Sequence, residues 1–263
     1  MDKDNAIIVF ARHPTPGRVK TRLAAGVGID GAARFYKHCA EKVIQECLKT
    51  DATTYIFFSA PEEEEQVRAW LSPLDVYKVL HFMTQVQSPD LGVRLADAIQ
   101  RIFDAENCSH RCVAVIGSDI PDLESTHLNN AFEALEESDV VFGPAKDGGY
   151  YLCALNKPQE SQQRINKHDF LRDFFEGIRW STHTVLKQNV DNAIRLGMTV
   201  APLATIPKLR DIDTIHDLAK WCHRDIFTNG SREAAEVMME GLKVLEQSGI
   251  TLEDGIESNE KNP

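Results

Sequence analysis

The sequence lacks an excess of positive charge. Its 263 residues include 29 lysines and arginines against 40 aspartates and glutamates, which gives a net charge of -11. General nucleic-acid-binding proteins usually present a basic surface to the phosphate backbone, so this balance argues against that class. We expect no nucleic acid among the partners, and a basic segment within so acidic a chain is therefore informative.

Long hydrophobic runs are also missing. No segment approaches the roughly 20 apolar residues that a membrane-spanning helix needs. The first apolar run, residues 6–11, is too short for the core of a signal peptide, and Arg12 follows it without a cleavage pattern of small residues. These absences argue against a membrane association and favour the cytoplasm.

Cysteine is scarce and scattered. The six cysteines fall mostly within apolar patterns, which predicts reduced core residues rather than a disulfide framework. A zinc site at Cys108, His110 and Cys112 is disfavoured because a second pair of ligands does not follow nearby.

The sequence does contain an alternation of short apolar runs with segments of helical periodicity. We expect strands at residues 6–11, 54–58, 78–82, 112–116, 139–142 and 150–155, and helices at 35–48, 91–103, 128–135, 182–196 and 214–222. This order predicts an α/β sandwich. We place one domain at residues 1–225, followed by an appended C-terminal helix and a polar tail at 226–263.

A basic loop follows the first predicted strand. Arg12, Arg18, Lys20 and Arg22 lie on a segment that also contains Gly17 and two prolines; we call residues 12–22 the cationic loop. Ligands of open α/β sheets bind at the carboxyl edge of the strands, and arginine can hold two phosphate oxygens at once. A solvated loop is the plain alternative, but this position favours phosphate binding.

The glycines that follow match a nucleotide-binding pattern but lack the structural context that the pattern requires. Residues 26–31 fit G-x-G-x-x-G, and Asp51 lies downstream at a suitable separation. A dinucleotide site requires these glycines directly between a strand and a helix, whereas the cationic loop intervenes here. We expect the glycines instead to shape the end of that loop.

Three aspartates are candidate metal ligands. Asp119 comes just after the predicted strand at 112–116, at the same sheet edge as the cationic loop. Asp211 and Asp213 alternate in an extended segment, so their side chains point the same way. Oxygen ligands of this kind suit Mg²⁺ or Mn²⁺ bridging two phosphates. We predict Asp119 and Asp213 as the metal pair, with Asp211 as a further candidate; a turn-capping role for Asp119 is the alternative.

Two further segments are candidates for substrate binding. Asp147 precedes Gly148 and Gly149 in a turn between two predicted strands. Asp147 either bonds to its own backbone or contacts sugar hydroxyls or the acceptor, and the residues alone leave both open. Trp180 and Ser181 form a weaker candidate, since a tryptophan more often belongs to the core.

Taken together, these segments resemble small bacterial-type glycosyltransferases with the GT-A fold, of the kind associated with radical-SAM and arsenosugar genes. They resemble more distantly the guanylyltransferases of molybdenum-cofactor and coenzyme F420 synthesis. The resemblance rests on residues 16–23, 90–94, 117–123, 147–152, 180–182 and 211–214, and covers roughly residues 6–223. This chain departs from the family pattern at three positions: it has Arg12 where a lysine is common, Pro89 where a glycine is usual and Val93 where an acidic residue is usual.

The resemblance implies a nucleotide-diphospho-sugar transferase fold, a three-layer α/β/α sandwich with a mixed, mainly parallel sheet. It places the cationic loop, Gly92 and Arg94 at the nucleotide phosphates, and Mg²⁺ or Mn²⁺ on Asp119 and Asp213. It also places Asp147 near the transferred sugar or the acceptor.

We therefore expect a metal-dependent glycosyltransferase with a nucleoside-diphosphate sugar as donor and a small-molecule acceptor. Asp147 and Lys20 are the candidate catalytic residues. A nucleotidyltransferase that uses a nucleoside triphosphate would need the same site, and a non-catalytic nucleotide-binding module is the alternative of another class. A homodimer is possible; the base, the sugar and the acceptor stay open.

Overall fold

A six-stranded sheet forms the centre of this computed structural model, which describes residues 4–105, 110–158, 170–223 and 232–249. The strand order is β3-β2-β1-β4-β6-β5. The strands are β1 (Asn5–Ala11), β2 (Thr53–Phe58), β3 (Leu80–Thr84), β4 (Cys112–Gly117), β5 (Val140–Pro144) and β6 (Tyr150–Asn156).

Most neighbouring strands run parallel. β1 pairs in parallel with both β2 and β4, and β2 with β3, whereas β6 runs antiparallel to both β4 and β5. β1 lies inside the sheet with both faces covered, and residues 6–9 have no exposed surface. This explains why its sequence is a continuous apolar run instead of an alternating one. The predicted mixed, mainly parallel sheet is confirmed.

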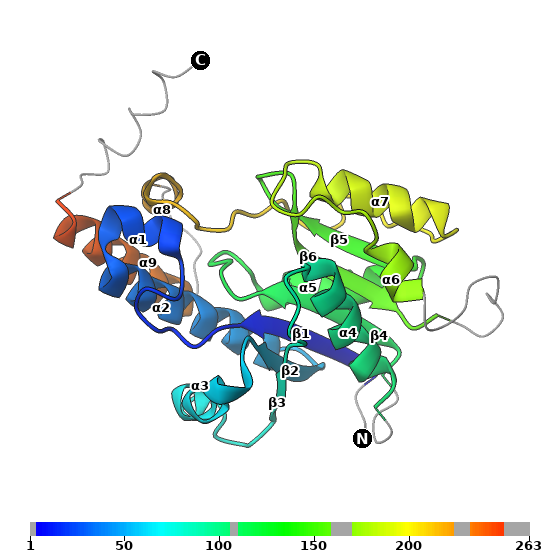
Figure 1. Ribbon diagram of the computed structural model, residues 1–263, viewed down its shortest axis with the longest axis horizontal. Coiled ribbons are helices and arrows are strands. Elements are labelled where there is room, and N and C mark those ends of the chain that lie inside the picture. Colours follow the sequence, from blue (N-terminus) through cyan, green and yellow to red (C-terminus); the bar gives the residue numbers. More distant parts are fainter. Residues whose placement is uncertain (1–3, 106–109, 159–169, 224–231, 250–263) are drawn as a thin grey trace, which may run out of the picture.

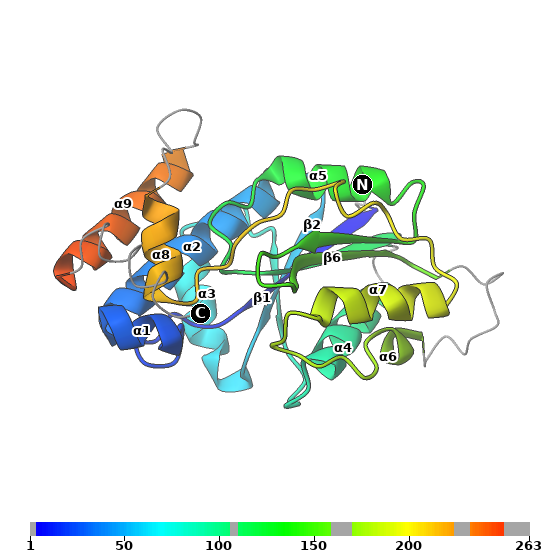
Figure 2. The same cartoon turned by 90° about the horizontal axis from the view of Figure 1, so that it is seen from above.

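Helices cover both faces of the sheet (Figure 2). α2 and α5 lie on one face, where Ile7 and Val9 of β1 join the core, and α4, α6 and α7 lie on the other, where Ala6 and Ile8 do. The helices on these two faces are α2 (Ile29–Leu48), η1 (Pro61–Glu63), α3 (Glu64–Leu71), α4 (Leu91–Phe103), α5 (Ser125–Ala134), α6 (Phe170–Phe174) and α7 (Val185–Arg195). The three-layer sandwich is therefore confirmed. Within the described ranges, no helix is both long and apolar enough to cross a bilayer.

A further group of helices packs at the end of the molecule toward which β1 points (Figure 1). It comprises α1 (Thr21–Val27), α8 (Ile215–Cys222) and α9 (Arg232–Gln247), together with the first half of α2. Its core contains the fully buried Phe35 and Trp221, whose rings meet edge to face with centroids 6.0 Å apart. The predicted C-terminal helix is present as α9. The domain boundary at residue 225 lies outside the described residues and stays a prediction.

The glycines of the G-x-G-x-x-G pattern lie between two helices. Gly28, with φ +77°, separates α1 from α2, and Gly26 packs so closely on α8 that an added Cβ would lie 2.8 Å from the Cβ of Ile215. Our expectation that these glycines shape the end of the cationic loop is wrong. They are needed for a helix junction and a close helix contact, which residue spacing does not reveal.

The cysteines of the described residues are free and buried, as predicted. Cys39 packs in the core between α2 and α9, and Cys153 packs beside β5 and α4. Cys108 of the disfavoured zinc site lies outside the described residues.

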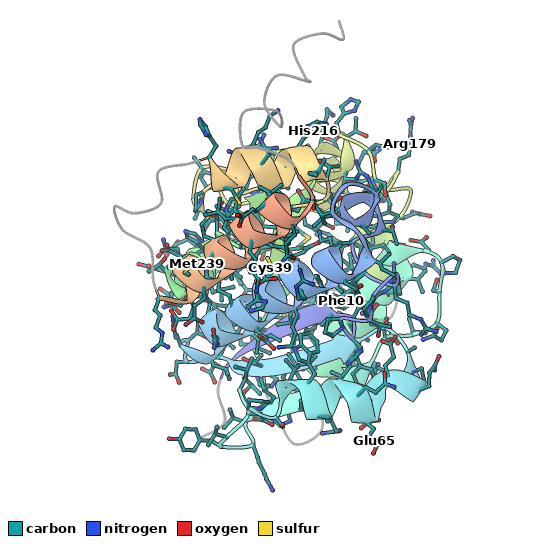
Figure 3. The ribbon with its side chains drawn as sticks, turned by 90° about the vertical axis from the view of Figure 1, so that its left-hand side faces the viewer. Phe10, Cys39, Glu65, Arg179, His216 and Met239 are labelled. Carbon is teal, nitrogen blue, oxygen red and sulfur yellow. The ribbon has the colours of Figure 1, made fainter. Side chains whose placement is uncertain are left out.

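Two adjacent methionines of α9 test how firmly this helix is attached. Met238 is 6% exposed in the core with α2, whereas Met239 is 69% exposed on the outer face, where Figure 3 labels it. We expect Met238→Ala to lower the free energy of unfolding by about 2–3 kcal/mol, because it removes buried methylene groups and leaves a cavity. Met239→Ala is the matched control and should change it by less than about 0.5 kcal/mol. Urea unfolding measures both, and equal effects would show that α9 does not pack as described.

Candidate functional site

The carboxyl ends of β1 and β4 bring the cationic loop and Asp119 together. Phe10 of β1 is the register partner of Gly117 in β4, so Arg12 and Asp119 each follow two residues beyond the same point of the sheet. Figure 3 labels Phe10 on this strand. The sequence prediction that these two segments share one edge of the sheet is borne out by this register.

The aspartates of the 211–213 segment reach the same edge by a separate route. Leu209 forms a parallel bridge with Ala145 after β5, and the Leu209 amide donates to the carbonyl of Pro144 at 3.1 Å. The chain then runs on to α8, whose first turn is capped by Thr214. This docking beside β5 carries Asp211 and Asp213 to the carboxyl edge of the sheet.

Lys20 joins the two predicted metal ligands. Its Nζ atom lies 2.7 Å from Oδ2 of Asp119 and 2.8 Å from Oδ1 of Asp213. The lysine side chain is only 7% exposed, whereas the two carboxylates are 32% and 37% exposed. The backbone of Lys20 is left-handed, with φ +46°, directly before α1. Such a conformation is uncommon for a residue with a side chain, and it persists where contacts with the surrounding structure stabilise it.

The charges around this contact shift each pKa in a different direction. Burial alone would lower the pKa of Lys20, but the charges of Asp119 and Asp213 outweigh it and hold the pKa above its ordinary value. Burial raises and Lys20 lowers the pKa of Asp213, with a net decrease. For Asp211, burial and then the charges of Asp119 and Asp213 outweigh the opposite effect of Lys20 and raise the pKa to about 6. The three carboxylates, which we call the carboxylate cluster, therefore carry more negative charge than the nearby cations neutralise.

Arg94 of α4 and Arg12 form a second group of cations. The Nε atom of Arg94 is buried and has no hydrogen-bond partner within the described residues, while its Nη1 donates to Gln85 Oε1 at 3.3 Å. Burial, and then the charge of Arg12, lower the pKa of Arg94. Two guanidinium groups that repel each other are suited to a ligand that carries negative charge.

Tyr36 of α2 ties the ends of β1 and β4 to each other, and sequence reasoning missed it. Its hydroxyl accepts from the Arg12 amide at 3.0 Å and lies 2.9 Å from the Ser118 hydroxyl. Both Tyr36 and Ser118 are buried. Tyr36 stands on the apolar face of a long helix, so the sequence offers no signal that separates it from an ordinary core residue.

Of the two alternatives for Asp147, the structure shows the bond between its side chain and the backbone of its own turn. Asp147 Oδ1 accepts from the Gly149 amide at 2.9 Å, so the side chain does bond to its own backbone. Gly148, with φ +94°, lies against the chain before α7: an added Cβ would stand 2.2 Å from the carbonyl oxygen of His183. Among the described residues, Oδ2 of Asp147 has no hydrogen-bond or ion-pair partner, and its role in ligand binding stays a prediction.

Trp180 and Ser181 lie on the loop between α6 and α7. The Trp180 indole donates to Oδ1 of Asp90 at 3.0 Å, and the same oxygen accepts from the Gly92 amide at the start of α4. Ser181 has a left-handed backbone, with φ +61°. Because Asp90 fixes the ring, Trp180 forms a firm wall instead of a mobile surface side chain.

These segments line an open cavity of about 610 Å³. Most of the predicted site residues line it: Arg12, Arg18, Lys20, Arg22, Arg94, Asp119, Asp147, Gly149, Trp180, Ser181, Asp211 and Asp213. Gly17, Gly92 and Gly148 are not in this lining; the amide of Gly92 is taken by Asp90, and Gly148 contacts His183. Their assignment to ligand binding stays a prediction.

Apolar side chains also line the cavity, on the side of α4 and α7. They are Phe10, Leu91, Leu95, Val115, Tyr150 and Val185. Tyr150 is held by a hydrogen bond of 2.9 Å to the fully buried Asn189. The cavity therefore combines a charged half with an apolar half, as in sites that bind a molecule with both kinds of surface.

A closed metal-binding arrangement does not occur in the part of the chain that the structure describes. No group of three or more histidine, cysteine, aspartate or glutamate side chains there is placed to hold a metal ion. The ammonium of Lys20 lies between the two predicted ligands, Asp119 and Asp213. The metal site stays a prediction.

The chain is similar to known proteins along nearly its whole length. A family model described as "Uncharacterized protein conserved in bacteria (DUF2064)" matches residues 43–182. A solved structure of a candidate nucleotide-diphospho-sugar transferase from Desulfovibrio desulfuricans G20 is 31% identical, with 94% of this chain and 98% of that chain covered and a TM-score of 0.76. No curated protein matches.

Two more distant structures share the fold alone. A cytidylyltransferase from Leptospira borgpetersenii is 12% identical, with 94% of this chain and 95% of that chain covered and a TM-score of 0.52. A 4-diphosphocytidyl-2C-methyl-D-erythritol synthase from Anaerococcus prevotii is 8% identical, with 92% and 96% covered and a TM-score of 0.51. The fold implied by the family resemblance is confirmed, and the association with radical-SAM and arsenosugar genes stays a prediction.

Asp211 should make the protein less stable as the pH rises. Its pKa is about 6 in the folded protein, against an ordinary value of 3.8, so the folded state binds this proton more tightly than the unfolded state does. Its contribution to the free energy of unfolding therefore falls as the pH rises from about 4 through about 6. We expect Asp211→Asn to raise the melting temperature at pH 7.5 in EDTA, and to raise it much less at pH 5.

Asp191→Asn is the control for this measurement, because that carboxylate lies on α7 with its side chain 57% exposed. Its effect should be the same at both pH values. Thermal unfolding followed by circular dichroism gives both comparisons. If the stability of Asp211→Asn relative to wild type were no greater at pH 7.5 than at pH 5, the raised pKa of Asp211 would be refuted.

Proposed function

Because the chain belongs to the DUF2064 family, and its relative of 31% identity is a candidate nucleotide-diphospho-sugar transferase, we propose that it is a metal-dependent glycosyltransferase. It takes a nucleoside-diphosphate sugar as donor and a small molecule as acceptor. One observation carries the proposal: Asp119 and Asp213, 94 residues apart in the sequence, both lie within 2.8 Å of one ammonium beside a cation-lined cavity.

The cationic loop and Arg94 bind the diphosphate of the donor. Arg12, Arg18 and Arg94 line the cavity, and none of them is held by a close ion pair within the described residues; the nearest, between Arg18 and Glu63, spans 3.9 Å. Guanidinium groups with free N–H donors hold phosphate oxygens in pairs and lower the cost of the charge that develops as the diphosphate departs.

The carboxylate cluster suits a divalent cation in its chemistry. Asp119, Asp211 and Asp213 offer hard oxygen ligands, which Mg²⁺ and Mn²⁺ prefer, and their excess of negative charge would be relieved by a second cation. When bound there, the metal would neutralise the diphosphate leaving group, a contribution on the order of several kcal/mol. Lys20 and Arg22, beside the same carboxylates, supply further positive charge to the leaving group.

The acceptor binds on the side of Asp147 and Trp180. Both residues line the cavity, and the free oxygen of Asp147 is available to take the proton of an acceptor hydroxyl while Trp180 and Ser181 position the sugar. Gly149, which lines the cavity, allows the backbone to approach the substrate closely, and Gly148 would contribute through the turn that it forms.

The second candidate is a nucleotidyltransferase, favoured by the charge of the cationic loop. Arg12, Arg18, Lys20 and Arg22 all line the cavity, and this number of cations suits the additional charge of a nucleoside triphosphate. Such an enzyme would couple the nucleotide to a small phosphorylated substrate. A non-catalytic module would bind the same nucleotides without turnover.

The released product separates these functions. We expect one sugar nucleotide among the UDP-, GDP-, ADP-, CDP- and dTDP-sugars to raise the melting temperature of the protein when Mn²⁺ is present. A ligand that binds the folded state stabilises it. That sugar nucleotide should then release free nucleoside diphosphate slowly in water and faster with an acceptor. Pyrophosphate released from a nucleoside triphosphate would instead support the nucleotidyltransferase. Stabilisation by nucleotides with neither product would support the binding module.

Asp119 should be essential to the reaction. We expect Asp119→Asn to reduce turnover by about 100-fold or more, because the variant loses a charged ligand for the divalent cation that would neutralise the departing diphosphate. Donor turnover measured at saturating Mn²⁺ checks this, with Asp191→Asn as a control that keeps the same change of residue outside the cavity. A variant with full activity would contradict the proposed site.

A further inference from the structure

Lys20 occupies the position between the carboxylates at which the proposed function requires a divalent cation. Its Nζ atom contacts Asp119 at 2.7 Å and Asp213 at 2.8 Å, while Arg22 adds a third contact at 3.2 Å to the other oxygen of Asp213. A cation bound by both carboxylates and this ammonium cannot share the same space. The two are therefore competitors for one pair of ligands.

The surroundings hold Lys20 firmly in this competing position. Its side chain is 7% exposed, and its left-handed backbone is fixed at the start of α1, where its carbonyl accepts from the amide of Ala24 at 2.8 Å. A free metal ion would have to displace the ammonium and leave it buried beside a double positive charge. Unpaired charges are costly to bury, so free metal ions meet a barrier that an open carboxylate pair would not present.

A nucleotide removes this barrier. Lys20 lines the same cavity as Arg12, Arg18 and Arg94, where the proposed function places the diphosphate. Phosphate oxygens offer the ammonium a new partner within the cavity, so that Lys20 can release the carboxylates without becoming unpaired. The long, flexible lysine side chain allows this change without movement of α1.

We propose that Lys20 excludes free divalent cations from Asp119 and Asp213, and that the site takes its metal only together with a nucleoside diphosphate. This inference rests on the proposed function, since it assigns the same cavity to the nucleotide. It makes Lys20 the residue that determines in which form the metal binds: as the metal–nucleotide complex and not as the free ion.

The experiment measures Mn²⁺ binding and does not depend on turnover. Free Mn²⁺ is followed by electron paramagnetic resonance as protein is added, first without nucleotide and then with UDP, GDP, ADP, CDP or dTDP, and the Mn²⁺ that each nucleotide binds without protein is subtracted. For wild type we expect affinity at least about 10-fold higher with one of these nucleotides than without. Lys20→Met should bind Mn²⁺ without nucleotide at least about 10-fold more tightly than wild type does, because the competing ammonium is gone.

Two further variants complete the design. Lys20→Gly removes the same ammonium and suits the left-handed backbone, so it keeps the test valid if Lys20→Met does not fold. Lys146→Met removes an equal charge from the exposed turn beside the site and should bind like wild type. Asp119→Asn in the Lys20→Met background should abolish the gained binding.

The outcomes separate this inference from the proposed function. If wild type and the Lys20 variants bind free Mn²⁺ equally, and a nucleotide increases the affinity of wild type, the exclusion by Lys20 is refuted while the proposed function stands. If no variant binds Mn²⁺ with or without any of the nucleotides, the metal dependence in the proposed function fails and the inference fails with it.

Discussion

An ammonium shared by two aspartates holds the candidate site together. Lys20, Asp119 and Asp213 come from three segments that are far apart in the sequence, and the contacts at 2.7 and 2.8 Å bring these segments to one point. Without Lys20, two partly buried carboxylates would repel each other across the mouth of the cavity. Lys20 therefore balances the negative charge at the point where the cationic loop, the end of β4 and the segment before α8 meet.

The sheet places these segments near one another independently of their charges. β1 and β4 are neighbours, so their carboxyl ends deliver the cationic loop and Asp119 side by side, and Tyr36 ties both ends to α2. The segment that carries Asp213 is docked separately, by the bridge of Leu209 to Ala145. The rigid strands thus position the loops that carry the charged residues, as is usual in α/β proteins.

The sequence was informative where a local pattern has only one physical meaning. The apolar run of β1 predicted a strand covered on both faces, and the alternation of Asp211 and Asp213 predicted that both side chains point the same way; both line the cavity. It was uninformative where a property arises from distant contacts. The left-handed backbone of Lys20, the insertion of β6 between β4 and β5, and the helix junction at Gly28 all depend on residues that no short pattern contains. The same holds for Tyr36: its hydroxyl contacts the ends of β1 and β4, but its position on an apolar helix face does not indicate this.

The close approach of Gly148 to His183 joins two walls of the cavity into one body. The turn that carries Asp147 rests on the backbone before α7, and the amide of Leu186 donates to the carbonyl of Gly148 at 3.1 Å. Trp180 stands on the loop just ahead of this contact. Changes in the range of molecules that this part of the cavity accepts should therefore arise by exchange of side chains on an unaltered backbone, since neither loop can be lengthened or shifted without carrying the other with it.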